Sequence, residues 1–257
     1  MLSFDQIKKI YSETILIQNS KAVLVEYVQH EILDSIYKQS GSENLSFMGG
    51  TAIRIVYNGK RFSEDLDFDN FGLSFLEFKK LLEKVVADMK AKGFDLEFKF
   101  IEKGAYHCYI KFPKILQESN LAVHKEEKIL VRIDTVRKKK QIKPEIFILD
   151  KFDVYRKILV NPVDIILSQK LVAILERKRE KGRDFYDVSF LLAKTIPNYK
   201  YLEKVHKIKK ADLKKIILKK TENLNFEQLT EDVAPFLQEP SDKERILTFK
   251  EYITNKL

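Results

Sequence analysis

The spacing of the apolar residues changes along this chain, and that change limits the folds it can adopt more than any other feature. Residues 1–40 and 74–92 carry an apolar residue every three or four positions, which is typical of amphipathic helices. From residue 94 to residue 159 the spacing is mostly two, as expected for strands of a half-buried sheet. After Asn161 the helical spacing returns and continues almost to the last residue. Strands with interleaved helices, followed by helices alone, predict an α+β (mixed α/β) fold in which a mixed sheet precedes an α-helical bundle.

Two domains are expected, with the boundary at Asn161. A chain of 257 residues is long enough for two small domains. Asn161 can cap a helix, and Pro162 suits the first helical position because its missing N–H is not needed there. We therefore expect residues 1–161 to form the sheet-containing domain with its N-terminal helices, and residues 162–257 to form the helical domain.

The composition excludes several classes of protein. Apolar residues make up 44% of the chain, which is enough to bury a core and excludes a disordered protein. The single cysteine, Cys108, excludes an intrachain disulfide, and the alternating pattern around it predicts a buried thiol. No stretch approaches the ~20 apolar residues that a membrane span requires. We therefore expect a cytoplasmic protein with no membrane partner.

The net charge is strongly positive. Lys and Arg number 47 against 38 Asp and Glu, which gives a formal charge of +9. A surplus of this size attracts partners that carry phosphate. Charged residues of both signs are nevertheless interspersed and make up 33% of the chain, so ordinary solvated surface explains much of the excess. The charge alone therefore leaves a nucleic-acid partner open.

Two adjacent glycines stand between a predicted strand and a predicted helix. Residues 45–48 read as a short strand and residues 51–57 as a helix, with Gly49 and Gly50 preceding Thr51. Glycine allows a positive φ and a close approach of the backbone, and the N–H groups at the start of a helix can bind an anion. With the Thr51 hydroxyl added, the segment predicts a phosphate-binding loop. A simple turn is the alternative interpretation of the two glycines.

Paired carboxylates follow this loop. Asp65 and Asp67 are two residues apart in a predicted strand, so their side chains point to the same face. Two carboxylates held close together repel each other unless a cation lies between them, and hard oxygen ligands suit Mg²⁺ or Mn²⁺. Two such ions ~3.5–4 Å apart can bind the attacking and leaving oxygens of a phosphoryl displacement. Asp69 continues the same face and ranks behind Asp65 and Asp67, and plain surface charge is the alternative explanation.

A third carboxylate is expected on a neighbouring strand. Asp134 lies in the middle of the otherwise apolar segment 130–136. An ionised group buried there is costly unless it is paired or bound to a metal. We predict Asp134 as a third metal ligand and catalytic residue, while an ion pair with Arg132 or Arg137 stays open as the alternative.

A second group of candidates lies on the helix after Pro162. Lys170, Ala173 and Arg177 are three and four residues apart, so they share one helix face. Apolar residues surround Lys170 in the sequence, and a lysine in that setting can contact a γ-phosphate. The alternative is a lysine whose stem packs on the core while its ammonium group reaches water.

A basic run leads from this helix to two further acids. Residues 177–183 contain five cations and lead into Asp184 and Asp187, which are one helical turn apart. The basic run can bind phosphates or be ordinary solvated charge. Asp184 is also placed to cap a helix, because a carboxylate accepts hydrogen bonds from the first helical amides.

Taken together, these motifs resemble the AbiEii/AbiGii toxin family, and the resemblance runs from about Asn44 to Leu192. This family consists of DNA-polymerase-β-like nucleotidyltransferases of type IV toxin–antitoxin and abortive-infection systems and is related to the MenT toxins. The motifs that carry the resemblance are Gly49-Gly50-Thr51, Arg61-x-Ser63-x-Asp65-Leu66-Asp67-Phe68, Lys170-x-x-Ala173-x-x-x-Arg177 and Arg183-Asp184-x-x-Asp187.

The resemblance implies a nucleotidyltransferase fold, Mg²⁺ (or Mn²⁺) and a nucleoside triphosphate (NTP). It implies that residues 1–161 are the catalytic domain and that residues 162–257 contribute to the nucleotide site. The expected catalytic residues are Asp65, Asp67, Asp134, Lys170 and Asp187, and the expected metal ligands are the first three of these. The expected nucleotide-binding residues are Gly49, Gly50, Thr51, Arg61, Ser63, Lys170, Arg177, Arg183 and Asp184.

Two departures from the family pattern matter. The usual Gly-Ser of the loop is Gly50-Thr51 here, which keeps the hydroxyl. The third sheet carboxylate is not strongly marked in the family, so Asp134 depends on the strand argument.

The expected activity is transfer of a nucleoside monophosphate from an NTP to an acceptor hydroxyl, in the manner of an EC 2.7.7 enzyme. The resemblance implies a toxin with an antitoxin protein as its partner and a tRNA, another RNA or a protein as acceptor. A metal-dependent phosphodiesterase or nuclease, and a non-catalytic nucleic-acid-binding adaptor on the same fold, are the alternatives. The sequence leaves open the acceptor, the preferred NTP, toxicity, the antitoxin, the oligomeric state and the choice of third acid among Asp134, Asp184 and Asp187.

Overall fold

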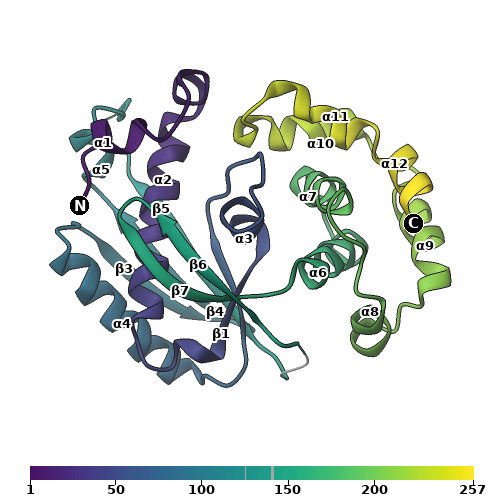
Figure 1. Ribbon diagram of the computed structural model, residues 1–257, viewed down its shortest axis with the longest axis horizontal. Coiled ribbons are helices and arrows are strands. Elements are labelled where there is room, and N and C mark those ends of the chain that lie inside the picture. Colours follow the sequence, from purple (N-terminus) through teal and green to yellow (C-terminus); the bar gives the residue numbers. More distant parts are fainter. Residues whose placement is uncertain (125, 140–141) are drawn as a thin grey trace. The chain divides into compact units, whose positions relative to one another are not determined.

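The computed structural model describes residues 1–124, 126–139 and 142–257, which form two compact units (Figure 1). The first unit contains Met1–Val56 and the greater part of residues 62–160. The second unit contains Asn161–Leu257 together with the short segment Tyr57–Arg61. The chain therefore enters the second unit briefly before it returns to complete the first.

The first unit is built on a mixed seven-stranded sheet with the strand order β3-β4-β5-β2-β1-β7-β6. Strands β2 and β5 are parallel, as are β1 and β7, whereas the other neighbouring strands are antiparallel. The strands are β1 (Leu45–Met48), β2 (Leu66–Asn70), β3 (Glu97–Glu102), β4 (Tyr106–Phe112), β5 (Ile129–Arg137), β6 (Glu145–Lys151) and β7 (Val154–Val160). The predicted mixed sheet is confirmed.

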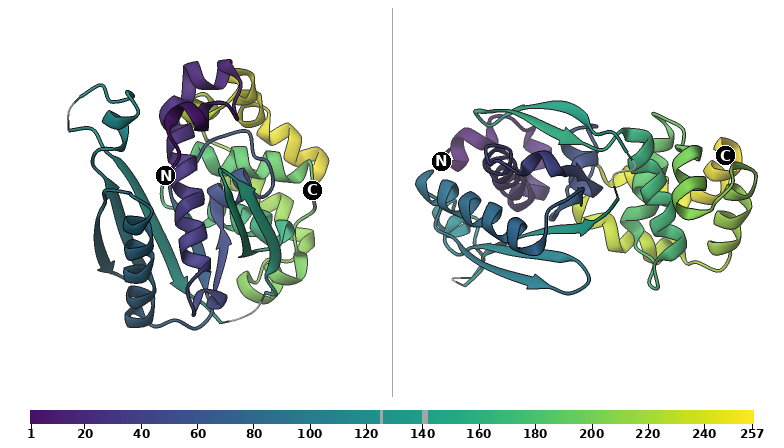
Figure 2. Two further views of the ribbon diagram at one scale, coloured as in Figure 1. Left: turned by 60° about the vertical axis from the view of Figure 1, so that its left-hand side comes forward. Right: turned by 90° about the horizontal axis from the view of Figure 1, so that it is seen from below.

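Helices accompany this sheet. They are α1 (Phe4–Lys8), α2 (Glu13–Tyr37), the 3-10 helix η1 (Ser42–Asn44), α3 (Gly49–Ile55), α4 (Phe75–Ala91) and α5 (Ile115–Glu118). Helices α2 and α4 pack side by side, and α2 also packs against β7 (Figure 2). The chain leaves helical φ and ψ values at Asn19 inside α2.

Local signals fix the ends of α4. Ser74 caps its first turn, where it accepts a hydrogen bond from the backbone N–H of Glu77, whose side chain in turn accepts from Ser74. Gly93 follows the helix with φ of 92°, a value that favours glycine. The apolar face of α4, which includes Phe78 and Leu82, is buried. The predicted amphipathic helix over residues 74–92 is confirmed.

The second unit is built from helices and the segments that connect them. Its helices are α6 (Val163–Glu176), α7 (Gly182–Leu192), α8 (Tyr199–His206), α9 (Lys210–Lys220), α10 (Phe226–Val233), the 3-10 helices η2 (Ala234–Phe236) and η3 (Pro240–Lys243), α11 (Glu244–Leu247) and α12 (Phe249–Lys256). Helix α7 is the centre of the unit, because it contacts α6, α10, α11 and α12. Its Phe185 packs edge-on against Phe249 and Phe226, with ring centroids 5.0 and 5.6 Å away.

The structure bears on the predicted buried thiol and on membrane-spanning helices. Cys108 is fully buried in β4, and burial raises the pKa of its thiol to about 12, as expected of an inert core cysteine. No helix in the described part of the chain is long and apolar enough to cross a membrane.

Candidate active site

The glycines predicted as a loop form the first turn of α3, which follows β1 directly and packs against Asp67. Gly49 has φ of 80°, and a Cβ atom at this position would lie 2.9 Å from the Cβ of Asp67. Only glycine satisfies both the conformation and the space. The Thr51 hydroxyl donates a hydrogen bond to the backbone carbonyl of Asp65, so this side chain connects the first turn of α3 to the residue before β2. Gly49, Gly50 and Thr51 are all buried, and their role in binding phosphate stays a prediction.

The strand register brings the predicted carboxylates together on the sheet. Asp67 of β2 stands opposite Asp134 of the parallel strand β5. Side chains of paired residues on neighbouring strands lie on the same face. Asp65 comes immediately before β2, two residues from Asp67. The three acids predicted from the sequence are therefore neighbours within the first unit.

A cation links two of these acids. The Nη2 atom of Arg132 lies 2.8 Å from Oδ2 of Asp65, and its Nε atom lies 2.9 Å from Oδ2 of Asp134. His107 of β4, opposite Asp134, places Nδ1 2.7 Å from its Oδ1. The pairing of Asp134 with Arg132, foreseen as the alternative, is thus present. Sequence reasoning did not assign a role to Arg132 or His107 in the site, although alternation along β5 puts Arg132 on the face of Asp134.

Asp69 has a different environment from Asp65 and Asp67. It is 2% exposed and forms an ion pair with Lys138. Asp65 and Asp67 are half-buried, and the side chain of Asp134 is 19% exposed. A catalytic carboxylate must reach its substrate, so the ranking of Asp69 behind the other two stays a prediction. Among the described residues, no three His, Cys, Asp or Glu side chains are grouped closely enough to hold one metal ion by themselves.

A second cluster is buried within the second unit around Asp187. Its two carboxylate oxygens each lie 2.7 Å from a guanidinium nitrogen of Arg61, which is a bidentate pair. Lys170 of α6 adds a third contact, with Nζ 2.9 Å from Oδ2 of Asp187. Asp187 is fully buried and Arg61 is 3% exposed.

The charges of this cluster determine its ionisation. Burial by itself would raise the pKa of Asp187, but the positive charges of Arg61 and Lys170 outweigh it and hold that pKa below its usual value. Burial likewise favours a neutral Lys170, yet Asp187 and Asp184 raise the pKa of its ammonium group above the usual value. All three groups are therefore charged at neutral pH.

Asp184 belongs to the same cluster, and the prediction that it caps a helix is wrong. Helix α7 begins at Gly182 after Lys181, and Asp184 is directed at two cations instead of the first amides. Its Oδ1 atom lies 3.1 Å from Nζ of Lys170, and its Oδ2 atom lies 2.8 Å from Nε of Arg177. The Lys170 ammonium is consequently buried among carboxylates, and the alternative in which it reaches water is also wrong.

Arg61 is held in place by backbone contacts within the second unit. Arg61 forms an isolated β-bridge with Leu237, and the N–H of Gln238 donates to the carbonyl of Lys60 over 3.0 Å. The Tyr57 hydroxyl donates to the carbonyl of Asn161 over 2.8 Å. Arg61, which pairs with Asp187, lies only four residues before Asp65 in the sequence.

Two predicted nucleotide-binding residues are not explained by these clusters. Ser63 belongs to the first unit, and its carbonyl accepts a hydrogen bond from Nε2 of Gln29 over 2.8 Å. Arg183 is half-buried in the first turn of α7. Their roles stay predictions.

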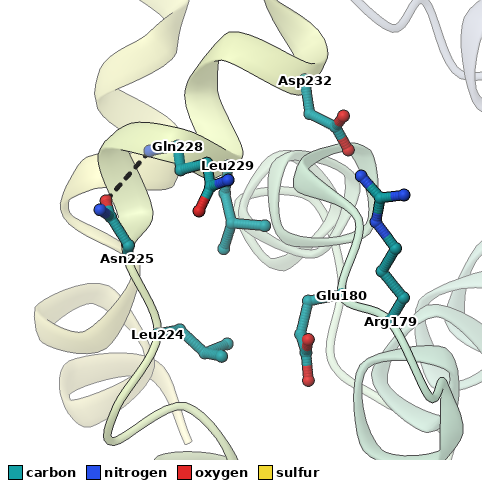
Figure 3. A pocket seen from close by; sticks show the side chains of 7 residues that line it. All are labelled: Arg179, Glu180, Leu224, Asn225, Gln228, Leu229 and Asp232. Atoms are coloured by element: carbon teal, nitrogen blue, oxygen red, sulfur yellow. Dashed lines mark hydrogen bonds between the residues drawn. The ribbon is translucent and has the colours of Figure 1, made fainter.

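The second unit also contains a polar cavity of about 170 Å³, bordered by the loop between α6 and α7 and by α10 (Figure 3). Its lining consists of Arg179, Glu180, Leu224, Asn225, Gln228, Leu229 and Asp232. A Cβ atom on Gly182 would overlap the carbonyl of Leu229, so glycine permits the close packing of α7 on α10 beside this cavity. None of the residues predicted for the active site lines it.

Comparisons with known proteins identify the family and the fold. Residues 31–255 match the family described as "Nucleotidyl transferase AbiEii toxin, Type IV TA system". Among solved structures, a protein from H. pylori provisionally assigned as a nucleotidyltransferase has a TM-score of 0.56 at 18% identity, with 95% of each chain covered. JHP933 from Helicobacter pylori has a TM-score of 0.54 at 17% identity, over 95% of this chain and 92% of that one. A comparison with curated proteins gives no match. The predicted nucleotidyltransferase fold is confirmed by these likenesses.

Proposed function

The chain belongs to the AbiEii family of nucleotidyltransferase toxins, and on that premise we propose that it transfers a nucleoside monophosphate from an NTP to an acceptor hydroxyl. The observation that carries the proposal is the register of the sheet, which sets Asp67 opposite Asp134 and beside Gly49. Carboxylates next to a glycine loop are what a bound triphosphate and its cation require.

The acids of the first unit would hold a divalent metal, most simply Mg²⁺ or Mn²⁺. Asp65, Asp67 and Asp134 offer only oxygen donors, which suits both ions. Mg²⁺ usually takes one or two protein carboxylates and completes its shell with water and substrate phosphates, so a full set of protein ligands is not needed. When bound, the metal would neutralise charge on the triphosphate.

Arg132 and His107 would position Asp134. A carboxylate fixed by two partners presents its remaining electron pairs in a defined direction. Asp134 is also better suited than Asp187 to accept the proton of the acceptor hydroxyl. A general base must be reachable by the substrate, and Asp134 is partly exposed, whereas Asp187 is fully buried.

The cluster of the second unit would supply positive charge for the triphosphate. The sequence-based proposal that Lys170 contacts the γ-phosphate would require its ammonium group to leave the carboxylates of Asp184 and Asp187. Arg177, whose side chain is 40% exposed, and Arg183 are proposed as further phosphate ligands. We assign Asp187 as a positioning residue, because it is fully buried and holds Arg61 and Lys170. The helical unit would thereby contribute to the nucleotide site.

An antitoxin protein is the proposed physiological partner, and a tRNA or another RNA is the proposed acceptor. A nuclease would use the same acids without the glycine loop, and a binding adaptor would need neither. The Gly49-Gly50-Thr51 motif is therefore the feature that favours the transferase.

The test is incubation of the purified protein with Mg²⁺, each α-³²P-labelled NTP and total RNA, followed by a denaturing gel. We expect label on RNA, and we expect Asp65→Asn and Asp67→Asn each to lower the rate about 100-fold or more, because each removes charge that acts on the transferred group. Asp150→Asn, on the exposed part of β6, is the matched control and should leave the rate unchanged. Equal label with all three variants would refute the site, and shortened RNA without label would indicate a nuclease.

A further inference from the structure

Helices α8 and α9 carry an unusual concentration of lysines. Residues 199–220 contain nine lysines against Glu203 and Asp212, a net of seven positive charges in a chain whose total is +9. Seven of these lysines are exposed, and we call them the lysine surface: Lys200, Lys204, Lys207, Lys209, Lys210, Lys215 and Lys219. Most of the chain's positive excess is therefore gathered in one part of the second unit.

Two of these lysines, Lys215 and Lys219, lie on the outward face of α9. Leu213 and Ile217 are buried and form the inner face of the helix. Lys215 and Lys219 lie on the opposite side, one helical turn apart, which spaces them by about 6 Å along the axis. Repeated positive charges along a helix suit a partner whose negative charges also repeat along a line.

Ion pairs join α8 and α9 to the end of α6 and to the loop between α6 and α7. Nζ of Lys220 lies 3.1 Å from Oε1 of Glu180, and Nδ1 of His206 lies 3.5 Å from Oε1 of Glu176. The loop adds four cations against one acid over residues 177–181, and it leads into α7 with Asp184 and Asp187. The cations of this loop therefore lie between the ion-paired ends of α8 and α9 and the helix that carries Asp184 and Asp187.

The composition of the lysine surface favours a nucleic acid over a protein. Protein interfaces are enriched in aromatic side chains and Arg and are depleted in Lys. In residues 199–220 the cations are Lys, and Ile216 is the large apolar side chain that is exposed, at 39%. Lysines without an apolar centre are suited to phosphates, which they contact as point charges without reading sequence.

From these observations we infer that the lysine surface binds the phosphate backbone of a nucleic-acid strand and holds it as the acceptor. The role of the strand as acceptor rests on the proposed transferase function, but binding of the strand can be measured without any transfer. The surface fixes the strand by its backbone, so it adds affinity and orientation and leaves base selection to other residues.

The experiment compares two fourfold variants of the full chain. In the first, Lys204, Lys209, Lys215 and Lys219 are changed to Gln. In the matched control, Lys80, Lys84, Lys90 and Lys99 of the first unit, which are also exposed, are changed to Gln. Both remove four charges, and Lys80 and Lys84 are four residues apart on α4, as Lys215 and Lys219 are on α9. Equal circular dichroism spectra and melting temperatures establish that both variants fold.

Binding of a fluorescein-labelled 20-nucleotide single-stranded RNA is followed by fluorescence anisotropy without NTP, over a range of salt concentrations. For single strands the plot of log K against log salt has a slope of about −0.7 per phosphate contact, so loss of four contacts should flatten it by about 3. We expect the first variant to bind about tenfold more weakly or worse, and the control to match the unaltered chain. A DNA strand of the same sequence distinguishes RNA from DNA as the bound strand.

Equal affinity and equal salt slope in the two variants would overturn the inference and leave an acidic protein as the occupant of this face. Transfer of labelled nucleotide to RNA at the unaltered rate by the first variant would also overturn it, because the surface would then not hold the acceptor. Weakened binding in the first variant, with no transfer by the unaltered chain, would instead reject the proposed function and retain a nucleic-acid surface.

Discussion

Asp187→Asn tests whether the buried cluster of the second unit positions side chains or acts on substrate. The substitution keeps the shape of residue 187 but removes the charge that compensates Arg61 and Lys170. Breaking a buried ion pair by removing one partner costs about 3–5 kcal/mol, because the remaining charge is left uncompensated. That is a large part of the ~5–15 kcal/mol that stabilises a typical domain.

The loss should be local, because both partners of Asp187 belong to the second unit. Hydrogen exchange followed by mass spectrometry resolves peptides that cover Gly182–Leu192. A loss of about 3 kcal/mol should accelerate exchange in them by about 100-fold or more. The control is Asp212→Asn on the exposed side of α9, which should change stability by less than ~0.5 kcal/mol.

The loss of stability caused by Asp187→Asn should also depend on pH. The lowered pKa of Asp187 stabilises the folded state at pH values above 3.8, its usual pKa, and this contribution is lost as the pH falls through the lowered value. The difference between the unaltered chain and Asp187→Asn should therefore be largest near neutral pH and should shrink in acid. If Asp187→Asn leaves the hydrogen exchange of α7 unchanged but abolishes transfer, Asp187 is a catalytic residue and its assignment as a positioning residue is refuted.

Two further substitutions test the first unit. Gly49→Ala should lower stability by about 1–3 kcal/mol and abolish transfer, because residue 49 has a φ that is unfavourable for alanine and the added Cβ atom would meet Asp67. The control is Gly93→Ala, where φ is 92° but no atom lies within 4 Å of the added Cβ. Equal urea midpoints and equal activities of the two variants would contradict the role of the contact with Asp67. Arg132→Gln should raise the affinity for Mn²⁺, measured by titration of the protein with the metal, by up to about fivefold. The reason is that a partly exposed ion pair worth up to ~1 kcal/mol no longer competes with the metal for Asp65 and Asp134. Weaker Mn²⁺ binding would mean that Arg132 supports the metal site.

The elements that the sequence predicted best have local signals. Residues 45–48 form β1 with the predicted bounds, because a short apolar run ends at two glycines. The Ser74 cap and Gly93 limit α4 through contacts made within a few residues. Alternation in β5 likewise placed Asp134 on a strand. Each of these features depends on neighbours in the chain, which a single sequence displays.

The contacts that the sequence did not predict join distant residues. Arg61 and Asp187 are 126 residues apart, and nothing near Arg61 indicates that its segment packs with the helical unit. Asp184 looked like a helix cap, but α7 begins earlier, at Gly182, and two cations from elsewhere engage the carboxylate. The pairing of Arg132 with Asp65 required the register of β2 and β5, which the residue pattern leaves undetermined.

The most direct test of the central claim is the stoichiometry of the reaction. The purified protein is incubated with Mg²⁺, an α-³²P-labelled NTP and its RNA acceptor, and both incorporated label and released pyrophosphate are measured over time. Transfer of a nucleoside monophosphate predicts one pyrophosphate for each nucleotide incorporated, with both products absent in Asp67→Asn. Release of inorganic phosphate without incorporation, or equal yields from Asp67→Asn, would contradict a nucleotidyltransferase built on these acids.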